Sequence, residues 1–320
     1  MSKATLYACA AIGLVFSSPA VSGSAAEFHT EFGSPAVYNG QQVRSFFSHN
    51  GNEIHALGVE VPAAMYDTAP MDPPSDGRYD VPGEAADAAG ATAWYCCGYE
   101  IVVPLPESAL RMSAFREVVL NWNPKGHIPP GVWDTAHTDF HFYFMGSDER
   151  LAIGRARDSH DMCVRPNPLG PEPPMVPFPQ SCAQLDLTAA VLPDDQMAPG
   201  YSNVGAIEPA MGNHLLDLAT HEFHGEAFTH TFIYMSNAGR LTGMEPMITL
   251  AYLRSLEAPV RVPISMPAAF PLAGLYPTEY VMEYDRGAGV FRVSYENWKA
   301  FPASNRLLAA ATAIESTSRP

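Results

Sequence analysis

Hydrophobic and polar residues alternate along several short stretches of the chain, which is the pattern of β-strands that bury one face. The clearest stretch is HTDFHFY at residues 137–143. A strand there places His137, Asp139, His141 and Tyr143 on one face, with a threonine and two phenylalanines on the other. Because the phenylalanine face predicts contact with a core, we expect the polar face to meet solvent or the interior of a barrel or cleft.

Two pairs of such stretches predict β-hairpins. QQVRSFFSH and NEIHALGVEVP are joined at Asn50 and Gly51, which favour the positive φ angles of a tight turn. EYVMEYD and VFRVSYENW are joined by a short segment with two glycines. Further strands are expected at 99–106, 115–124 and 227–235, and 247–255 is expected to be a short helix or a strand. This spacing predicts a mainly β fold, a sandwich or barrel of short antiparallel strands with long proline-rich loops and few short helices.

Composition supports a folded chain with many loops. Hydrophobic residues make up 47% of the 320 residues and charged residues 16%, which is enough apolar material for a core. The 30 prolines are nearly twice the usual share of about 5%. We expect one β-rich domain at 27–303 that carries a proline-rich insertion at 163–182, followed by a tail at 304–320. Residues 66–92 are rich in Pro, Asp, Gly and Ala and predict a long surface excursion.

The first 26 residues have the layout of a secretory signal peptide. One lysine precedes an apolar stretch from Ala4 to Phe16, and small residues follow up to Ala26. We expect cleavage after Gly23 or Ala26 and a protein exported to the periplasm or the extracellular space. No later stretch has the roughly 18 apolar residues of a membrane span, so we expect no transmembrane anchor.

Removal of the leader leaves four cysteines, which favour disulfides in an oxidising compartment. They are Cys96, Cys97, Cys163 and Cys182. A bridge between the last two would close the proline-rich segment and restrict the unfolded chain by about 3 kcal/mol. The adjacent pair would then bridge to each other or reach the loop cysteines, and the pattern leaves the pairing open.

The charge of the chain bears on its partners. Lys and Arg number 18 against 34 Asp and Glu, for a formal net charge of -16, and no basic run occurs. Nucleic acid is not expected as a partner, because its binding begins with neutralisation of phosphates. A divalent cation or a cationic ligand suits this negative field better.

The polar face of 137–143 has the residue types of a metal site. Two imidazoles and a carboxylate on one strand face can supply two or three ligands to one ion. A third histidine, His214, follows a glycine-bearing turn, and Glu245 lies beside a proline. Paired histidines followed by a histidine after such a turn partly resemble the ligand set of cupins. The glutamate of the first cupin motif is missing, so a carboxylate would come from Asp139, Asp217 or Glu245.

Four segments carry a second resemblance. They read VVLNWNPKGHIPPGVWDTAHTDFHFYF, EPAMGNHLLD, FTHTFIYM and MEPMITLAYL, in this order. Together they resemble an exported bacterial domain family of unknown function, one relative of which belongs to an extracytoplasmic sigma-E stress regulon. The resemblance spans about residues 40–300. The residues that match the family's motif positions are His137, Asp139, His141, His214, Asp217 and Glu245.

The chain departs from this family mainly in its turns. Where this chain has Trp133, Thr138 and residues 235–239, the family has a tyrosine, a phenylalanine and a Gly-x-Tyr-Asp-Gly turn. The family also lacks the cysteine-bracketed proline loop. These departures affect loop shape and assembly more than the polar residues. The resemblance implies a β-rich exported protein that can form a homo-oligomer, and it implies no reaction.

These observations lead to one hypothesis and one alternative. The hypothesis is an exported protein that binds one divalent metal ion through His137, His141 and His214, with Asp139 or Glu245 as the fourth ligand or as an orienting group. If the protein is an enzyme on an unidentified small molecule, the ion would activate a water or polarise a carbonyl, with Asp217 or Glu245 as the base. The alternative is a non-catalytic envelope protein, binding a ligand or forming an oligomer, whose histidines are structural.

Overall fold

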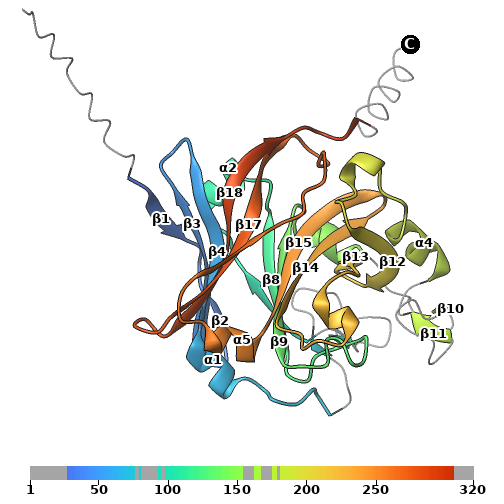
Figure 1. Cartoon of the computed structure of the whole chain (residues 1–320), viewed down its shortest axis with the longest axis horizontal. Helices are drawn as coiled ribbons and strands as arrows, with labels where there is room; N and C mark the ends of the chain where they lie inside the picture. The colour runs from blue at the N-terminus through green and yellow to red at the C-terminus, as the bar shows by residue number, and fades with distance from the viewer. Residues whose placement is uncertain are drawn as a thin grey trace, which may run out of the picture.

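The computed structural model describes residues 27–75, 79–80, 93–94, 98–153, 162–166, 175–178 and 181–305. Within these residues the protein is mainly β, with two seven-stranded antiparallel sheets that pack face to face as a sandwich (Figure 1). The predicted fold class is therefore confirmed.

The first sheet has the strand order β1-β3-β4-β18-β17-β16, and β2 pairs with β3 at its edge. Its strands are β1 (His29–Phe32), β2 (Ala36–Tyr38), β3 (Gln41–His49), β4 (Ile54–Pro62), β16 (Val260–Pro263), β17 (Gly274–Asp285) and β18 (Val290–Phe301). Both predicted hairpins are confirmed, since β3 pairs with β4 and β17 with β18. The second hairpin is longer than expected, because each of its strands has 12 residues.

The second sheet has the order β12-β13-β14-β15-β9-β8-β7. Its strands are β7 (Tyr99–Val103), β8 (Glu117–Asn123), β9 (His137–Tyr143), β12 (Tyr201–Glu208), β13 (Gly212–Asp217), β14 (His230–Asn237) and β15 (Arg240–Thr249). Two further strand pairs join β5 (Tyr79–Asp80) to β6 (Ala93–Trp94) and β10 (Cys163–Pro166) to β11 (Met175–Phe178).

The described helices are short. They are α1 (Ala63–Thr68), α2 (Glu107–Met112), α3 (Ser147–Leu151), α4 (Cys182–Thr188), α5 (Leu250–Ser255) and the 3-10 turns η1 (Asp194–Gln196) and η2 (His221–His224). The stretch 247–255 is both a strand and a helix, because β15 ends at Thr249, whose side chain accepts the N–H of Tyr252 and caps α5. No helix in the described part of the chain is long and apolar enough to cross a membrane.

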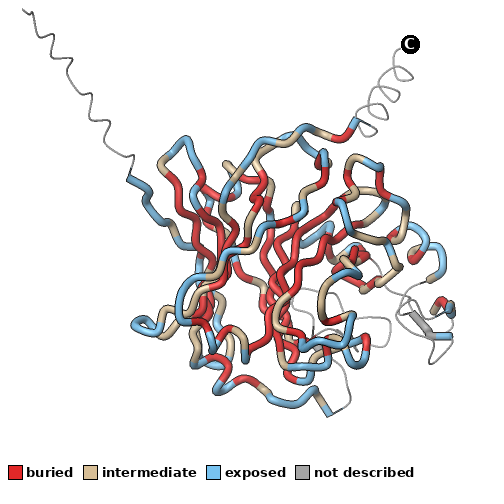
Figure 2. The backbone as a smooth tube through the Cα atoms, in the orientation of Figure 1, coloured by how far each residue is buried: buried red, intermediate tan, exposed pale blue. Residues whose placement is uncertain are grey.

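The main core lies between the two sheets and is rich in aromatic rings. Phe142 of β9 meets Tyr295 of β18 with ring centroids 4.7 Å apart, and Phe115 stacks on the same tyrosine at 5.6 Å. Figure 2 shows that burial follows the strands of both sheets, whereas the turns at their ends are largely exposed. The large area of such pairs makes this interface the main source of hydrophobic stabilisation.

Strand β9 is buried on both faces, which the alternating pattern did not predict. All seven of its residues are buried, including the polar ones. Its phenylalanines face the core, whereas its polar residues lie under a cover on the outer face of the second sheet. The cover includes Trp133 and Phe223, whose rings are 5.4 Å apart, and Phe228, whose ring is 5.3 Å from that of His137. The polar face therefore meets neither open solvent nor a barrel interior.

The proline-rich insertion is closed by a disulfide. Cys163 at the start of β10 is bonded to Cys182 at the start of α4, across a sequence separation of 19. Cys96 and Cys97 lie outside the described residues, as do the expected signal peptide at 1–26, most of 76–97 and the tail from 306. The domain boundaries, the leader and the pairing of these two cysteines stay predictions.

Candidate metal centre

The polar residues of β9 lie between polar side chains of β8 and residues of β15. In the antiparallel register, His137 pairs with Asn123, and Asp139 pairs with Asn121 on one side and Met247 on the other. Side chains that are opposite each other in a sheet point to the same face. Strand pairing therefore gathers imidazole, carboxylate and amide groups under the outer cover of the second sheet.

One group of ligand atoms comes from His127, His137 and Asp139, which we call the aspartate triad. One atom from each residue lies within 4.8 Å of the others. His137 Nε2 is 3.1 Å from Asp139 Oδ1, and His127 Nε2 is 3.5 Å from Asp139 Oδ2. Asn123 donates from Nδ2 to Asp139 Oδ2 at 2.8 Å and so fixes the carboxylate from β8. Both oxygens of this carboxylate thus lie close to neighbouring side chains.

The loop between β8 and β9 brings His127 back over the sheet. Gly126 begins the turn with φ 72°, and its N–H donates to Asn123 O at 3.2 Å. A Cβ at Gly126 would collide with Trp133 O, the same carbonyl that accepts the N–H of His127 at 3.1 Å. Only glycine combines this φ with such close backbone contact. The residue before His127 therefore decides where its imidazole lies.

A second group comes from His141, His214 and Glu245, which we call the glutamate triad. Its ligand atoms also lie within 4.8 Å of one another. His141 Nε2 is 3.4 Å from Glu245 Oε1, and His214 Nε2 is 3.6 Å from Glu245 Oε2. The register of β9 with β15 places Glu245 beside His141, and β13 supplies His214 from two strands further along the sheet.

Backbone carbonyls hold three of these four imidazoles by the same nitrogen. The Nδ1 atoms of His127, His137 and His214 lie 2.8, 2.6 and 3.0 Å from the carbonyl oxygens of Ile128, Thr135 and Ala206. A carbonyl only accepts, so each Nδ1 carries a proton, and in a neutral ring Nε2 then presents a lone pair. In each case that Nε2 faces the carboxylate of its triad, which is the arrangement of histidine ligands in metal sites.

The two carboxylates differ in charge state. Burial alone would raise the pKa of Asp139, but the imidazoles of His137 and His127 outweigh burial and hold it well below its usual value. Burial raises the pKa of Glu245 well above its usual value, and the negative charge of Asp139 adds to this effect. In the metal-free protein the negative charge is therefore favoured on Asp139, and burial favours the neutral form of Glu245.

The histidines of the glutamate triad are neutral at physiological pH. Burial lowers the pKa of His141 to about 3 and that of His214 to about 4. For His127, burial lowers the pKa, but its hydrogen bond and attraction to Asp139 reverse the effect and raise it. Burial also raises the pKa of Glu208 on β12 to about 7, which the nearby His127 partly offsets. Neutral imidazoles are the form that binds metal ions.

The structure divides the predicted ligands between the two triads. The hypothesis gathered His137, His141 and His214 around one ion, but His137 lies in the aspartate triad and the other two lie in the glutamate triad. Asp217 lies outside both triads, at the end of β13, where its Oδ1 accepts the N–H of Ala219 at 2.9 Å. His127 was not among the predicted ligands; the signal that could have pointed to it is the glycine and the two prolines that surround it directly before β9.

A buried ion-pair network continues the polar layer beyond Tyr143. Arg150 is fully buried and donates to Glu117 at 2.8 Å and to Glu100 at 3.0 Å. Its guanidinium also lies 5.6 Å from the ring of Tyr143, which stacks on His141 with centroids 5.6 Å apart. This network holds the ring that packs against the glutamate triad.

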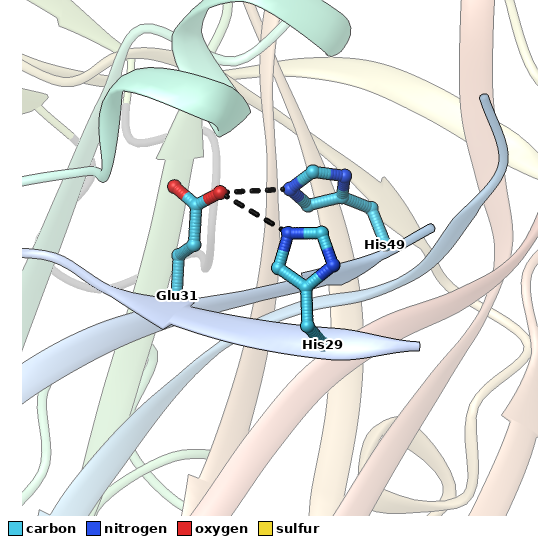
Figure 3. A group of neighbouring side chains, drawn as sticks. All are labelled: His29, Glu31 and His49. Carbon is cyan, nitrogen blue, oxygen red and sulfur yellow. Dashed lines mark hydrogen bonds and ion pairs between the residues drawn. The ribbon is translucent and has the colours of Figure 1, made fainter. Parts of the chain in front are cut away.

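A third histidine-carboxylate group, on the first sheet, has a different proton arrangement. Figure 3 shows one carboxylate oxygen of Glu31 facing both His49 and His29, and the Nε2 to Oε1 distances are 3.0 and 3.4 Å. The N–H of Gly51 donates to His49 Nδ1 at 2.9 Å, so the proton of that ring is on Nε2 and is donated to Glu31. Ser108 donates to the other oxygen of Glu31 at 2.7 Å. This group is a hydrogen-bonded link between β1, β3 and α2.

Comparison with known proteins gives no further guide to the centre. No family model, no curated protein and no solved structure matches this chain. The two triads and their buried surroundings therefore carry the functional conclusion.

Proposed function

We propose that the protein binds a divalent transition-metal ion at the aspartate triad. The observation that carries this proposal is the position of two imidazole Nε2 atoms, both turned toward one buried carboxylate and both able to coordinate a metal ion once deprotonated. His137 Nε2 and Asp139 Oδ1 are buried 3.1 Å apart, and neither has a hydrogen-bond partner among the residues that the structure describes. Two electron-rich atoms at this separation repel each other unless a cation is shared between them.

The ligand spacing supports a metal ion. Zinc bonds to histidine and carboxylate are about 2.0–2.1 Å long, so neighbouring ligand atoms of a tetrahedral site are roughly 3.3 Å apart. The distances from Asp139 to the two imidazole nitrogens are 3.1 and 3.5 Å. The side chains already have the spacing that coordination requires, and binding needs little rearrangement.

A proton on each imidazole is the competing explanation. Two imidazolium rings beside one carboxylate would be like charges in a buried site, and the ring centroids of His127 and His137 are only 4.7 Å apart. One dication satisfies both nitrogens and the carboxylate together. Two nitrogen ligands and one oxygen ligand favour zinc, iron(II) or a related ion over calcium or magnesium, which prefer oxygen ligands.

Three protein ligands leave at least one coordination position open. Catalytic zinc sites and non-haem iron(II) sites both use two histidines and a carboxylate with an open position. The open position suits a water that the ion activates or a small-molecule ligand. His127, whose side chain is 14% exposed, is the member of the triad nearest to solvent.

Metal analysis of the mature chain tests this proposal. A tag-free protein from residue 27, purified without chelator, is expected to carry an ion at the aspartate triad, and His127→Ala and His137→Ala should each lower the metal content by that one ion. His49→Gln is the matched control, because His49 is also a buried histidine beside a glutamate but keeps its proton on Nε2. If the folded protein neither contains metal nor gains thermal stability from added zinc, the histidines are structural and the proposal is wrong.

We also propose that the protein is exported. The predicted leader, the resemblance to an exported family and the Cys163–Cys182 disulfide support this proposal. Amino-terminal sequencing after expression in a bacterium is expected to find cleavage after Gly23 or Ala26. Retention of the full leader in a cytoplasmic, reduced protein would contradict it.

A further inference from the structure

We infer that the glutamate triad binds a second divalent ion, so that the protein contains a pair of neighbouring metal ions under the outer cover of the second sheet. This inference rests on the proposed function, because it extends metal binding from the aspartate triad to His141, His214 and Glu245. It differs from that proposal in stoichiometry, in ligands and in the interaction between the ions.

The glutamate triad has the same ligand spacing as the aspartate triad. Its two Nε2 to carboxylate distances are 3.4 and 3.6 Å, close to the roughly 3.3 Å expected between ligands of one zinc ion. Each imidazole faces a different oxygen of Glu245. His214 is fixed by its Nδ1 contact to Ala206 O at 3.0 Å, which leaves its Nε2 as the ligand atom.

Unpartnered buried atoms point to a cation in this triad. Within the described part of the chain, both ring nitrogens of His141 and Oε2 of Glu245 are buried without a hydrogen-bond partner. His141 is 1% exposed and Glu245 is 2% exposed. A proton shared with Glu245 could satisfy one nitrogen of His141, but an imidazolium would also need an acceptor at the other nitrogen. A metal ion on Nε2 leaves the same proton on Nδ1, so the ring alone does not separate the two, but a dication shared by both imidazoles and Glu245 also gives Oε2 of that carboxylate a partner.

The strand geometry places the two ions close together. Asp139 and His141 are two residues apart on the same face of β9, a separation of about 6.6 Å along the strand. The ions are therefore expected at a distance of this order, too far to share one oxygen atom but within strong electrostatic and magnetic interaction. Two dications against the two carboxylates of the triads leave a net charge of +2, so the pair favours an oxyanion with at least two oxygens.

Each triad has one histidine that is the member nearest to solvent. The side chain of His127 in one triad is 14% exposed and that of His214 in the other is 12% exposed, whereas Asp139 and Glu245 are each 2% exposed. A ligand would reach each ion beside its partly exposed histidine, and one that spans about 6.6 Å would contact both.

Stoichiometry and electron paramagnetic resonance test the inference. Wild-type protein is expected to bind two zinc ions, and His141→Gln or Glu245→Gln is expected to bind one. Loaded with copper(II), the wild type should show dipolar broadening and a half-field signal from the coupled pair. Both features should disappear in His141→Gln and in His137→Gln, each of which keeps one ion, and remain in His49→Gln.

The outcomes separate the two proposals. One zinc ion per wild-type chain, lost in His137→Gln but retained in His141→Gln, would overturn the second site and leave the proposed function intact. No bound zinc in folded wild-type protein would overturn both. Two zinc ions without any magnetic coupling of bound copper would overturn the pairing. Circular dichroism of each variant ensures that only folded proteins are compared.

Discussion

Replacement of Asn123 by leucine removes the side chain that orients the carboxylate of the aspartate triad. Asn123 is 1% exposed, and its Nδ2 donates to Asp139 Oδ2 at 2.8 Å and to Asn121 O at 3.2 Å. Leucine has the same branching and number of side-chain heavy atoms, although its methyl groups are bulkier than the amide, so the change removes the hydrogen bonds without opening a cavity. The substitution replaces no proposed metal ligand.

Two magnitudes follow from these contacts. Loss of a side chain that orients a ligand costs about 10- to 100-fold in metal affinity, which corresponds to about 1.4–2.7 kcal/mol of binding free energy. In the metal-free protein, a hydrogen bond to a charged group contributes about 1.5–3 kcal/mol, so Asn123→Leu should lower the free energy of unfolding by this amount. Asp139 is ionised, because His137 and His127 hold its pKa low despite its burial. The loss of stability is therefore larger than for a hydrogen bond to a neutral acceptor.

A competition titration with a zinc-binding dye, together with urea unfolding in the presence of chelator, measures both quantities. Thr138→Val is the matched control, because Thr138 is on the same strand but its hydroxyl meets Tyr66 on the opposite face at 2.9 Å. The control should lose about 1 kcal/mol of stability and keep its metal affinity. If Asn123→Leu binds zinc within twofold of wild type while remaining folded, Asp139 is not a ligand and the reasoning fails.

The remaining predictions concern charge and cross-linking. In the metal-free protein, burial lowers the pKa of His141 to about 3 and of His214 to about 4. Both therefore stay neutral in the folded state while the unfolded chain protonates near pH 6.5, and the free energy of unfolding should fall by about 2 kcal/mol per histidine between pH 6.5 and 5. Chelated protein with both histidines replaced by glutamine should show a correspondingly flatter pH profile in urea unfolding, and an unchanged profile would contradict the assignment. Arg150→Met leaves two buried carboxylates without their guanidinium and should cost about 3–5 kcal/mol, most of which returns when Glu100 and Glu117 are also made glutamine. Reduction of the disulfide that closes the proline-rich segment should lower the free energy of unfolding by about 3 kcal/mol, and a change under 1 kcal/mol in urea unfolding would contradict the loop-closure reasoning.

Local patterns predicted the fold class but not the environment of β9. Alternation at 137–143 separates two faces correctly, because side-chain direction in a strand depends only on neighbouring residues. Burial of the polar face depends on the covering loop that carries Trp133 and on Phe223, which packs against it from far along the chain. No pattern within a single strand reports such a cover, so the sequence left the polar face to meet either solvent or the interior of a barrel or cleft.

Local sequence patterns also could not predict which residues form each triad. His141 and Glu245 meet because β9 pairs with β15, and His214 joins them from β13, two strands away in the sheet. His127 reaches Asp139 because Gly126 turns the chain tightly over the end of the sheet. The residue types indicated a metal site, but the strand register and the turn at Gly126 decide which residues lie together in each triad.

The cover over β9 would also limit how fast an ion can enter and leave the proposed site at the aspartate triad. An ion held by His137 and Asp139, which are 0% and 1% exposed, cannot depart without outward movement of the turn that carries His127. Because His127 is itself a proposed ligand, a bound ion would hold this turn in place and so slow its own release. Under the proposed function, a bound ion is therefore expected to remain in place for long times after free metal is withdrawn.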